Sequence, residues 1–306
     1  MLNSTKKANK SIYVLMLLTV IVLWGIDPIV NKLQYDNYSP LALSIINTFF
    51  TALLFFAISI KKLNLIDKRF LKVAVPIGAL NSFACILQRI GLLLTSPANY
   101  AFLEHLSCAF VPIALFVITK KRPTVFQLFI TIICLIGCLL ISGVLGGPFS
   151  LSVGDALCAI SGVIFGFVIA LMSHYLNGVD IILFTCFQFI SYFILSVILA
   201  ICLNAIKING APVEQFRFSF KAIHLIFAIC FAIVTVGLGW LLRNTALTHL
   251  NPVFVSITSP LSAVISACVS IVAKMDVFSI TLLIGATLIV TAVILSGINS
   301  SSKHNK

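Results

Sequence analysis

The chain consists mainly of long apolar runs that short polar breaks separate. Ten runs of roughly 17–25 residues can be counted, and each can cross a hydrocarbon core as a helix. They lack the alternation of apolar and polar residues that marks an outer-membrane strand. The pattern therefore predicts an all-α polytopic membrane protein with ten transmembrane helices. We expect them at about 11–30, 40–60, 73–94, 98–118, 125–142, 156–175, 181–203, 222–242, 251–273 and 277–298.

The two halves of the chain resemble each other on either side of a Gly- and Pro-rich break at Gly143–Ser150. Trp24-Gly25 corresponds to Phe165-Gly166, and Leu87-Gln88-Arg89 corresponds to Leu241-Leu242-Arg243, with a proline following in each case. Each half holds five spans, an odd number, so the second half enters the membrane upside down. We expect two inverted five-helix repeats, with a site near the middle of the membrane where they meet. The predicted boundaries are 1–10 for a tail, 11–145 and 146–299 for the repeats, and 300–306 for a second tail.

Composition agrees with a membrane location, because 60% of residues are hydrophobic and 9% are charged, against about 25% charged in soluble domains. A net charge of +12 suggests nucleic acid in a soluble protein, but here the Lys and Arg residues lie in short loops. Thirteen of them fall on the side that holds both termini and five on the other, so both termini are predicted to be cytoplasmic in a multi-pass cell (inner or plasma) membrane protein. The N-terminal run is too long for a signal peptide and is interpreted as a retained helix.

Ionisable residues inside spans are costly and indicate function by default. Arg89 and Glu104 flank a short turn at similar depth, roughly 8–12 Å from it at about 1.5 Å per residue. Asp27 lies about as far from its own helix end. An Asp27–Arg89–Glu104 cluster is therefore a hypothesis for a substrate or proton site, and the alternative is a purely structural ion pair between helices.

His105 and Arg243 each allow two interpretations. His105 either shares a proton relay with Glu104 or is a packed, hydrogen-bonded histidine. Arg243 either extends to the membrane interface or receives an anionic substrate group, since its planar fork suits carboxylate and phosphate.

Prolines and tryptophans complete the list of candidates. Pro28, Pro112 and Pro260 either free carbonyls toward a cavity or only kink helices. Trp24 and Trp240 either line a pocket or only pack. The nine Cys residues have no metal-type spacing and are interpreted as small buried side chains. Neither a cofactor nor a metal is expected, and no enzyme motif is present.

Short motifs in a fixed order carry a resemblance that covers about 12–298. They are Leu87-Gln88, Gly91-Leu92 and Phe110-Val111-Pro112 in the first half, and Gly154-Asp155, Ser259-Pro260 and Gly285-Ala286 in the second. The chain resembles the EamA-type ten-helix permeases of the drug/metabolite transporter superfamily. The resemblance implies a carrier of small metabolites, most often an exporter. Glu104 and Arg243 depart from the family pattern, as does Ser259, which stands where Glu is frequent.

These observations lead to one main hypothesis. The protein is expected to be a secondary transporter that exports a small polar metabolite, an amino acid or related compound, by alternating access. Its expected partners are a small-molecule substrate and the lipid bilayer, with protons as a candidate coupling ion and without nucleic acid. The alternatives are an uptake carrier or exchanger for a metabolite such as S-adenosylmethionine, and, in another class, a lipid translocator or a non-transport membrane subunit.

Overall fold

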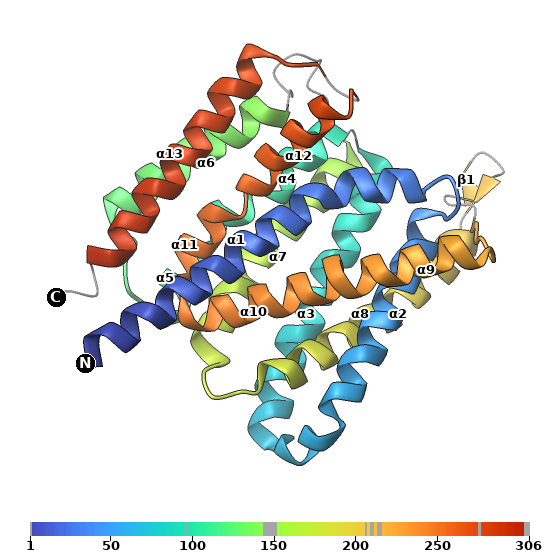
Figure 1. Cartoon of the computed structure of the whole chain (residues 1–306), viewed down its shortest axis with the longest axis horizontal. Coiled ribbons are helices and arrows are strands. Elements are labelled where there is room, and N and C mark those ends of the chain that lie inside the picture. The colour runs from blue at the N-terminus through green and yellow to red at the C-terminus, as the bar shows by residue number, and fades with distance from the viewer. Residues whose placement is uncertain are drawn as a thin grey trace. The chain divides into compact units, whose positions relative to one another are not determined.

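The computed structural model describes residues 2–95, 97–142, 152–205, 207–208, 211–212, 216–274 and 277–302 (Figure 1). Helices form nearly all of the described chain. In order, the elements are α1 (Leu2–Gln34), α2 (Pro40–Ser59), the 3₁₀ helix η1 (Ile60–Leu65), α3 (Lys68–Leu94), α4 (Pro97–Glu104), α5 (Ser107–Thr119), α6 (Val125–Ser142), α7 (Val153–Tyr175), α8 (Ile181–Ala205), strands β1 (Lys207–Ile208) and β2 (Ala211–Pro212), α9 (Ala222–Phe231), the π-helix η3 (Ala232–Leu238), α10 (Gly239–His249), α11 (Pro252–Thr258), α12 (Leu261–Val272) and α13 (Ile280–Ser302).

The ten predicted membrane spans are confirmed. Within the described ranges, ten helical segments are long and apolar enough to cross a membrane. Their bounds differ from the predicted ones mainly where a helix continues past its apolar run: the third begins at Lys68 and the eighth continues to His249. The first helix begins at Leu2, so the N-terminal residues predicted as a tail are helical.

The second span ends in the 3₁₀ helix η1, and three more spans depart from a regular α-helix in their interior. The fourth is interrupted between α4 and α5, where the His105 N–H donates to the Phe102 carbonyl at 3.1 Å and the Leu106 N–H donates to Leu103 at 3.2 Å. This three-residue spacing is that of a 3₁₀ turn. The ninth is interrupted between α11 and α12, at Ser259-Pro260, and the eighth contains η3.

The chain forms two compact units, each of which takes segments from both halves of the sequence. Unit 1 comprises Met1–Ile26, Leu87–Asn177 and Thr245–Lys306, and unit 2 comprises Asp27–Ile86 and Gly178–Asn244. Helices α1, α3 and α10 contribute residues to both units.

In unit 1, glycines allow helices to pack closely. Helices α6 and α13 lie side by side (Figure 1), and a Cβ added to Gly137 would lie 2.9 Å from the Gly285 carbonyl oxygen. On α7, a Cβ at Gly162 would lie 2.9 Å from the Leu103 carbonyl oxygen, and one at Gly166 would lie 2.6 Å from Phe110 Cβ. Membrane helices approach this closely only where small residues face the partner, so these glycines position α4 and α5 against α7.

In unit 2, α2 packs on both α8 and η3. The rings of Phe55 and Phe189 stack with centroids 6.1 Å apart. The Thr51 hydroxyl donates to the Ala232 carbonyl at 3.1 Å, so a side chain of α2 satisfies a backbone acceptor at the first residue of the π-helix. Between α8 and α9, β1 and β2 form a short antiparallel pair in which Ile208 opposes Ala211.

Candidate functional site

The predicted site residues divide between the two units. Trp24, Arg89, Glu104 and His105 belong to unit 1, whereas Asp27, Trp240 and Arg243 belong to unit 2. The predicted Asp27–Arg89–Glu104 cluster draws on both units, and it stays a prediction.

Within unit 1, Arg89 of α3 lies within electrostatic reach of Glu104, and their role as a site stays a prediction. The Gln88 side chain, also on α3, lies near the Glu104 carboxylate. Glu104 is the last residue of α4, so the pair joins α3 to the interruption in the fourth span. Gln88 is a partner that the sequence motif contained but that we did not assign a role.

His105 faces a group of thiols. Its side chain is 7% exposed and interacts with Cys134 of α6. Cys134 in turn contacts the thiols of Cys108 and Cys138, and its Sγ lies 3.7 Å from the Ile257 carbonyl oxygen. Both interpretations of His105 stay predictions.

Six of the nine cysteines are buried, which agrees with their interpretation as small core side chains. Cys202, Cys230 and Cys268 are exposed on the protein surface, so for these three that interpretation is wrong. All three lie in apolar segments of membrane-spanning length. In the described part of the chain, no group of three or more His, Cys, Asp and Glu side chains could hold a metal ion.

The three prolines differ in their effect on the backbone. Pro28 lies inside the continuous helix α1, and Pro112 lies inside α5. Pro260 is the N-cap of α12 and does interrupt its span. The interruption in the fourth span lies at His105-Leu106, before Pro112, so a proline marks the break in only one of these two spans.

Asp27 and Trp24 lie on α1, on either side of the boundary between the units. The Asn31 side-chain amide donates to Asp27 Oδ2 at 2.6 Å, one helical turn away. Both Asp27 and Trp24 are partly buried. The carboxylate therefore has a polar partner on its own helix.

Unit 2 contains a buried group of polar side chains that we call the polar centre. Its members come from the middle of α3 and from the facing parts of α8 and α10, and all are between 0% and 5% exposed. They are Asn81, Ser82, Thr185, Gln188, Arg243 and Asn244.

Hydrogen bonds link most of the polar centre across three helices. The Asn244 amide donates to Gln188 Oε1 at 2.9 Å and to Thr185 Oγ1 at 3.1 Å. The Ser82 hydroxyl donates to the Gln188 carbonyl at 2.9 Å. Helix α3 approaches α8 closely at this level, because a Cβ at Gly78 would lie 3.4 Å from Gln188 Cα.

Arg243 brings a positive charge into the polar centre. Its side chain is 5% exposed, and its guanidinium carbon lies 5.0 Å from the centroid of the Trp240 ring. It also interacts with Cys85 of α3, whose Sγ lies 3.8 Å from the Asn81 amide. The Arg243 side chain is almost completely buried, and the two interpretations of Arg243 stay predictions.

Two side-chain oxygen atoms of the polar centre accept no hydrogen bond from the described residues. The Oδ1 atoms of Asn81 and Asn244 are buried, and neither accepts a hydrogen bond from any described residue. Because a buried polar atom without a partner costs about 1–3 kcal/mol, such atoms need an explanation, and a bound donor supplies one.

Sequence reasoning found Arg243 but missed the other members of the polar centre. A usable signal was present, since Gln188 and Asn244 are amide side chains well inside apolar runs. Amides were not counted as candidates because only ionisable residues were treated as costly in lipid.

The Gly154-Asp155 motif has a structural role at the start of α7. Asp155 Oδ1 accepts hydrogen bonds from Thr95 and, at 2.9 Å, from Asn99, while Oδ2 accepts from the Ser152 amide at 2.7 Å. A Cβ at Gly154 would lie 2.6 Å from the Leu94 carbonyl oxygen. The motif therefore fastens the α3–α4 turn to the N-terminus of α7.

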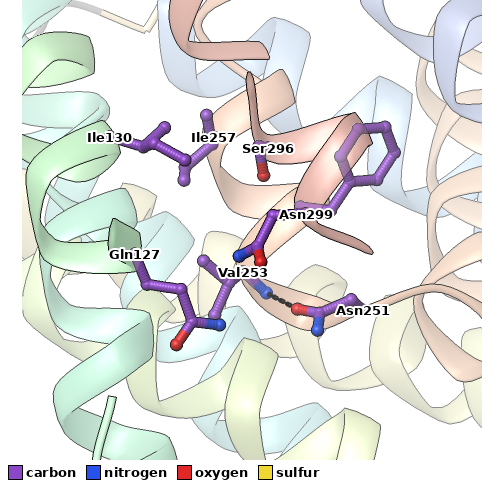
Figure 2. A pocket seen from close by; sticks show the side chains of 8 residues that line it. Gln127, Ile130, Asn251, Val253, Ile257, Ser296 and Asn299 are labelled. Atoms are coloured by element: carbon purple, nitrogen blue, oxygen red, sulfur yellow. Dashed lines mark hydrogen bonds between the residues drawn. The ribbon is translucent and has the colours of Figure 1, made fainter. Parts of the chain in front are cut away.

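A small pocket in unit 1 lies apart from the predicted site residues (Figure 2). Gln127, Asn251 and Asn299 turn amides toward it, and Asn251 Oδ1 accepts from the Val253 N–H at 2.9 Å. Its volume, about 10 Å³, is enough for about one water molecule. The described pocket is thus too small for a metabolite.

Comparisons with known proteins agree with this architecture. Residues 11–143 and 152–298 each match the EamA-like transporter family. A search of curated proteins finds no significant match. Among solved structures, one titled only "Crystal structure of protein" is similar, with a TM-score of 0.76 and 16% identity over 95% of this chain and 98% of that chain. That identity supports the fold alone. The two family matches each span five of the ten helices, which supports the inverted repeat. The chain belongs to the EamA-like transporter family.

Proposed function

We propose that this protein is a secondary transporter that exports a small polar metabolite, an amino acid or a related compound, by alternating access between its two repeats. Membership of a transporter family supports a small-molecule substrate and a membrane location. Two repeats of five spans each support alternating access, because inverted repeats can exchange conformations around a shared site. Export follows the family resemblance, and the excess of Lys and Arg supports cytoplasmic termini in the inner membrane.

The polar centre of unit 2 is the observation that carries the proposal. A guanidinium offers paired donors that match a carboxylate, and burial of Arg243 removes competing water. The free acceptors Asn81 Oδ1 and Asn244 Oδ1 suit an ammonium group. A carboxylate at Arg243 and an ammonium at the asparagine oxygens would together bind a zwitterion, with the Trp240 ring beside it.

Asp27, Glu104 and Arg89 remain candidates for a second part of the pathway. Asp27 accepts a hydrogen bond from Asn31, and Glu104 lies within the electrostatic reach of Arg89 on α3. Trp24 and the break at Pro260 are proposed to contribute to lining and gating.

A thermal-shift experiment on the full-length protein in detergent tests the substrate class. The probes are amino acids and S-adenosylmethionine, each compared with a derivative whose carboxylate is esterified. A ligand whose concentration is 100 times its Kd stabilises the folded state by about 2.7 kcal/mol. An amino acid that binds as a zwitterion should therefore raise the Tm, whereas its ester should not. Arg243→Gln should abolish the ligand-induced Tm shift. Arg243→Lys should lower the affinity for the ligand at least tenfold, because Lys lacks the paired donors.

Arg122→Gln is the matched control. Arg122 is exposed in the loop between α5 and α6, so this variant loses an arginine but should keep the full ligand response. A ligand-induced Tm shift that persists in Arg243→Gln would show that Arg243 does not bind the substrate. Equal Tm shifts for an amino acid and for its ester would exclude recognition of a zwitterion.

A further inference from the structure

The segment Phe216–Lys221, which we call the strap, lies against the turn between α1 and α2, and both belong to unit 2. The Ser39 N–H donates to the Arg217 carbonyl at 2.9 Å, and the Arg217 N–H donates to Ser39 Oγ at 3.3 Å. The Tyr38 hydroxyl donates to the Ser219 carbonyl at 3.2 Å. These bonds hold the backbone of the strap in place, so they also determine which of its side chains are left open.

The aromatic side chains of the strap divide between the protein and its surroundings. The Phe218 ring meets the Tyr38 ring edge to face, with centroids 5.4 Å apart, and Tyr38 is 1% exposed. The Phe220 ring lies 4.8 Å from that of Phe218 but is 88% exposed. Phe216, at the other end of the strap, is also exposed. Phe218 therefore attaches the strap to unit 2, whereas the other two rings are open to the surroundings.

The open rings continue an apolar surface that meets lipid. Helix α9 begins at Ala222, directly after the strap, and its Ile223, Ile226 and Phe227 side chains are exposed. The span Ala222–His249 is long enough to cross a membrane, so these side chains contact lipid chains. The strap lies at the end of this span, at the level where lipid chains meet their headgroups. An exposed apolar patch with a polar rim is typical of a membrane contact.

Two basic side chains lie among these rings. Arg217 and Lys221 are both exposed. One N–H of the Arg217 guanidinium donates to the Tyr35 carbonyl, which leaves further donors of the five that a guanidinium has. Asp36 is exposed in the facing turn, but among the described residues it forms no ion pair with either basic side chain. The strap thus carries two positive charges and no negative charge.

We propose that the strap is a binding site for the headgroups of anionic phospholipids. The phosphate oxygens match the planar fork of Arg217 and the ammonium of Lys221, while Phe220 contacts the lipid chains. A phosphatidylcholine headgroup carries its own cation, so the strap prefers a headgroup with net negative charge. Each basic residue near a membrane surface strengthens this preference roughly fivefold. The site goes beyond the proposed transport function and does not depend on it.

Fluorescence quenching of the full-length protein in lipid vesicles tests this site without a substrate. Phe220→Trp places a tryptophan on the strap, and the wild type, whose Trp24 and Trp240 lie in spans, supplies the background emission. Phosphatidylcholine vesicles contain a fixed minor fraction of lipid with brominated chains, which is either phosphatidylglycerol or phosphatidylcholine. Brominated phosphatidylglycerol should quench the added emission more strongly, corresponding to an enrichment of at least about fivefold beside the strap.

Charge-removing variants of the Phe220→Trp protein assign the preference to the strap. Arg217→Gln combined with Lys221→Gln should abolish it. Lys221→Gln alone should lower it about fivefold, and this variant removes no described side-chain contact of the strap, which guards against a folding defect in the double variant. Lys274→Gln is the matched control, because Lys274 is an exposed basic residue between α12 and α13. This variant should keep the full preference.

A change of salt concentration separates headgroup recognition from contact with the lipid chains. Raising the salt from about 0.01 M to about 1 M shortens the Debye length from about 30 Å to about 3 Å, so the preference should fall. Equal quenching by the two brominated lipids at low salt would overturn the proposal, as would a preference that survives in the double variant. A preference that is lost equally in Lys274→Gln would assign it to the overall charge of the protein and also overturn the proposal.

Discussion

The side-chain amide of Asn244 donates a hydrogen bond to Gln188 Oε1 at 2.9 Å, and both residues are completely or almost completely buried. The bond joins α10 to α8 in a part of unit 2 where apolar side chains would be expected. Polar contacts between membrane helices are worth about 0.6 kcal/mol on average, so stability alone is a weak reason for this network. Binding of a polar substrate is a stronger one.

Asn244→Leu should reduce ligand binding and also lower stability. The change leaves Gln188 Oε1 and Thr185 Oγ1 without their donor, which should cost about 1–3 kcal/mol. Thermal unfolding in detergent measures this loss, and the ligand-induced Tm shift measures binding. Adding Gln188→Leu should recover part of the stability, because the unsatisfied acceptor is removed, but it should not recover binding. Recovery of both stability and ligand binding in the double variant would show that the hydrogen-bond network has only a structural role.

Gly137→Ala should destabilise the contact between α6 and α13. An added Cβ would lie 2.7 Å from Ile289 Cγ1 and 2.9 Å from the Gly285 carbonyl oxygen, and overpacking of this kind costs about 1–3 kcal/mol. Gly297→Ala is the control on α13, since its Cβ would meet only Phe254 Cε2 at 3.6 Å. Thermal unfolding should show a lower Tm for the first variant and an unchanged or higher Tm for the second. Equal effects would exclude the close approach.

Asp180 should make stability depend on pH in acid solution. Burial raises the pKa of Asp180, but hydrogen bonds from Lys62 and from the Leu183 N–H lower it more, so the pKa lies below its ordinary value. The Lys62 ammonium lies 2.7 Å from Asp180 Oδ2. Because the folded pKa is below the unfolded value of about 3.9, the stabilisation is present above about pH 4 and is lost as the pH falls through the folded pKa.

Asp180→Asn should therefore lower the Tm at neutral pH and have little effect at low pH. A partly exposed pair of this kind contributes about 0.2–1 kcal/mol. Asp180→Ala should cost about 1 kcal/mol more, since it also removes the acceptor for the Leu183 N–H at the start of α8. A Tm difference between wild type and Asp180→Asn that grows toward acid pH would contradict the sign of the shift.

Particular residues explain why the candidate site was only partly predictable. Arg89 and Glu104 could be placed at similar depth from sequence because a short turn fixes the register of two adjacent helices, and their pairing stays a prediction. Asn244 and Gln188 are 56 positions apart, and no local rule relates α10 to α8. The fourth span is interrupted at His105-Leu106, where the packing of Gly162 against Leu103 fixes α4 on α7, rather than at Pro112, and no sequence motif marks that position.

The sequence by itself determined the ten membrane-spanning helices and the repeat of five, because apolar length and the need to satisfy every backbone group inside the helix are local properties. The tertiary structure alone decided which polar side chains meet. It grouped Arg243 with Trp240 and left the Oδ1 atoms of Asn81 and Asn244 buried without a donor from the described residues. It also fastened Asp155 to the α3–α4 turn. Such groupings depend on how distant helices pack, and in lipid that packing is set by small residues and interhelical hydrogen bonds rather than by hydrophobic pattern.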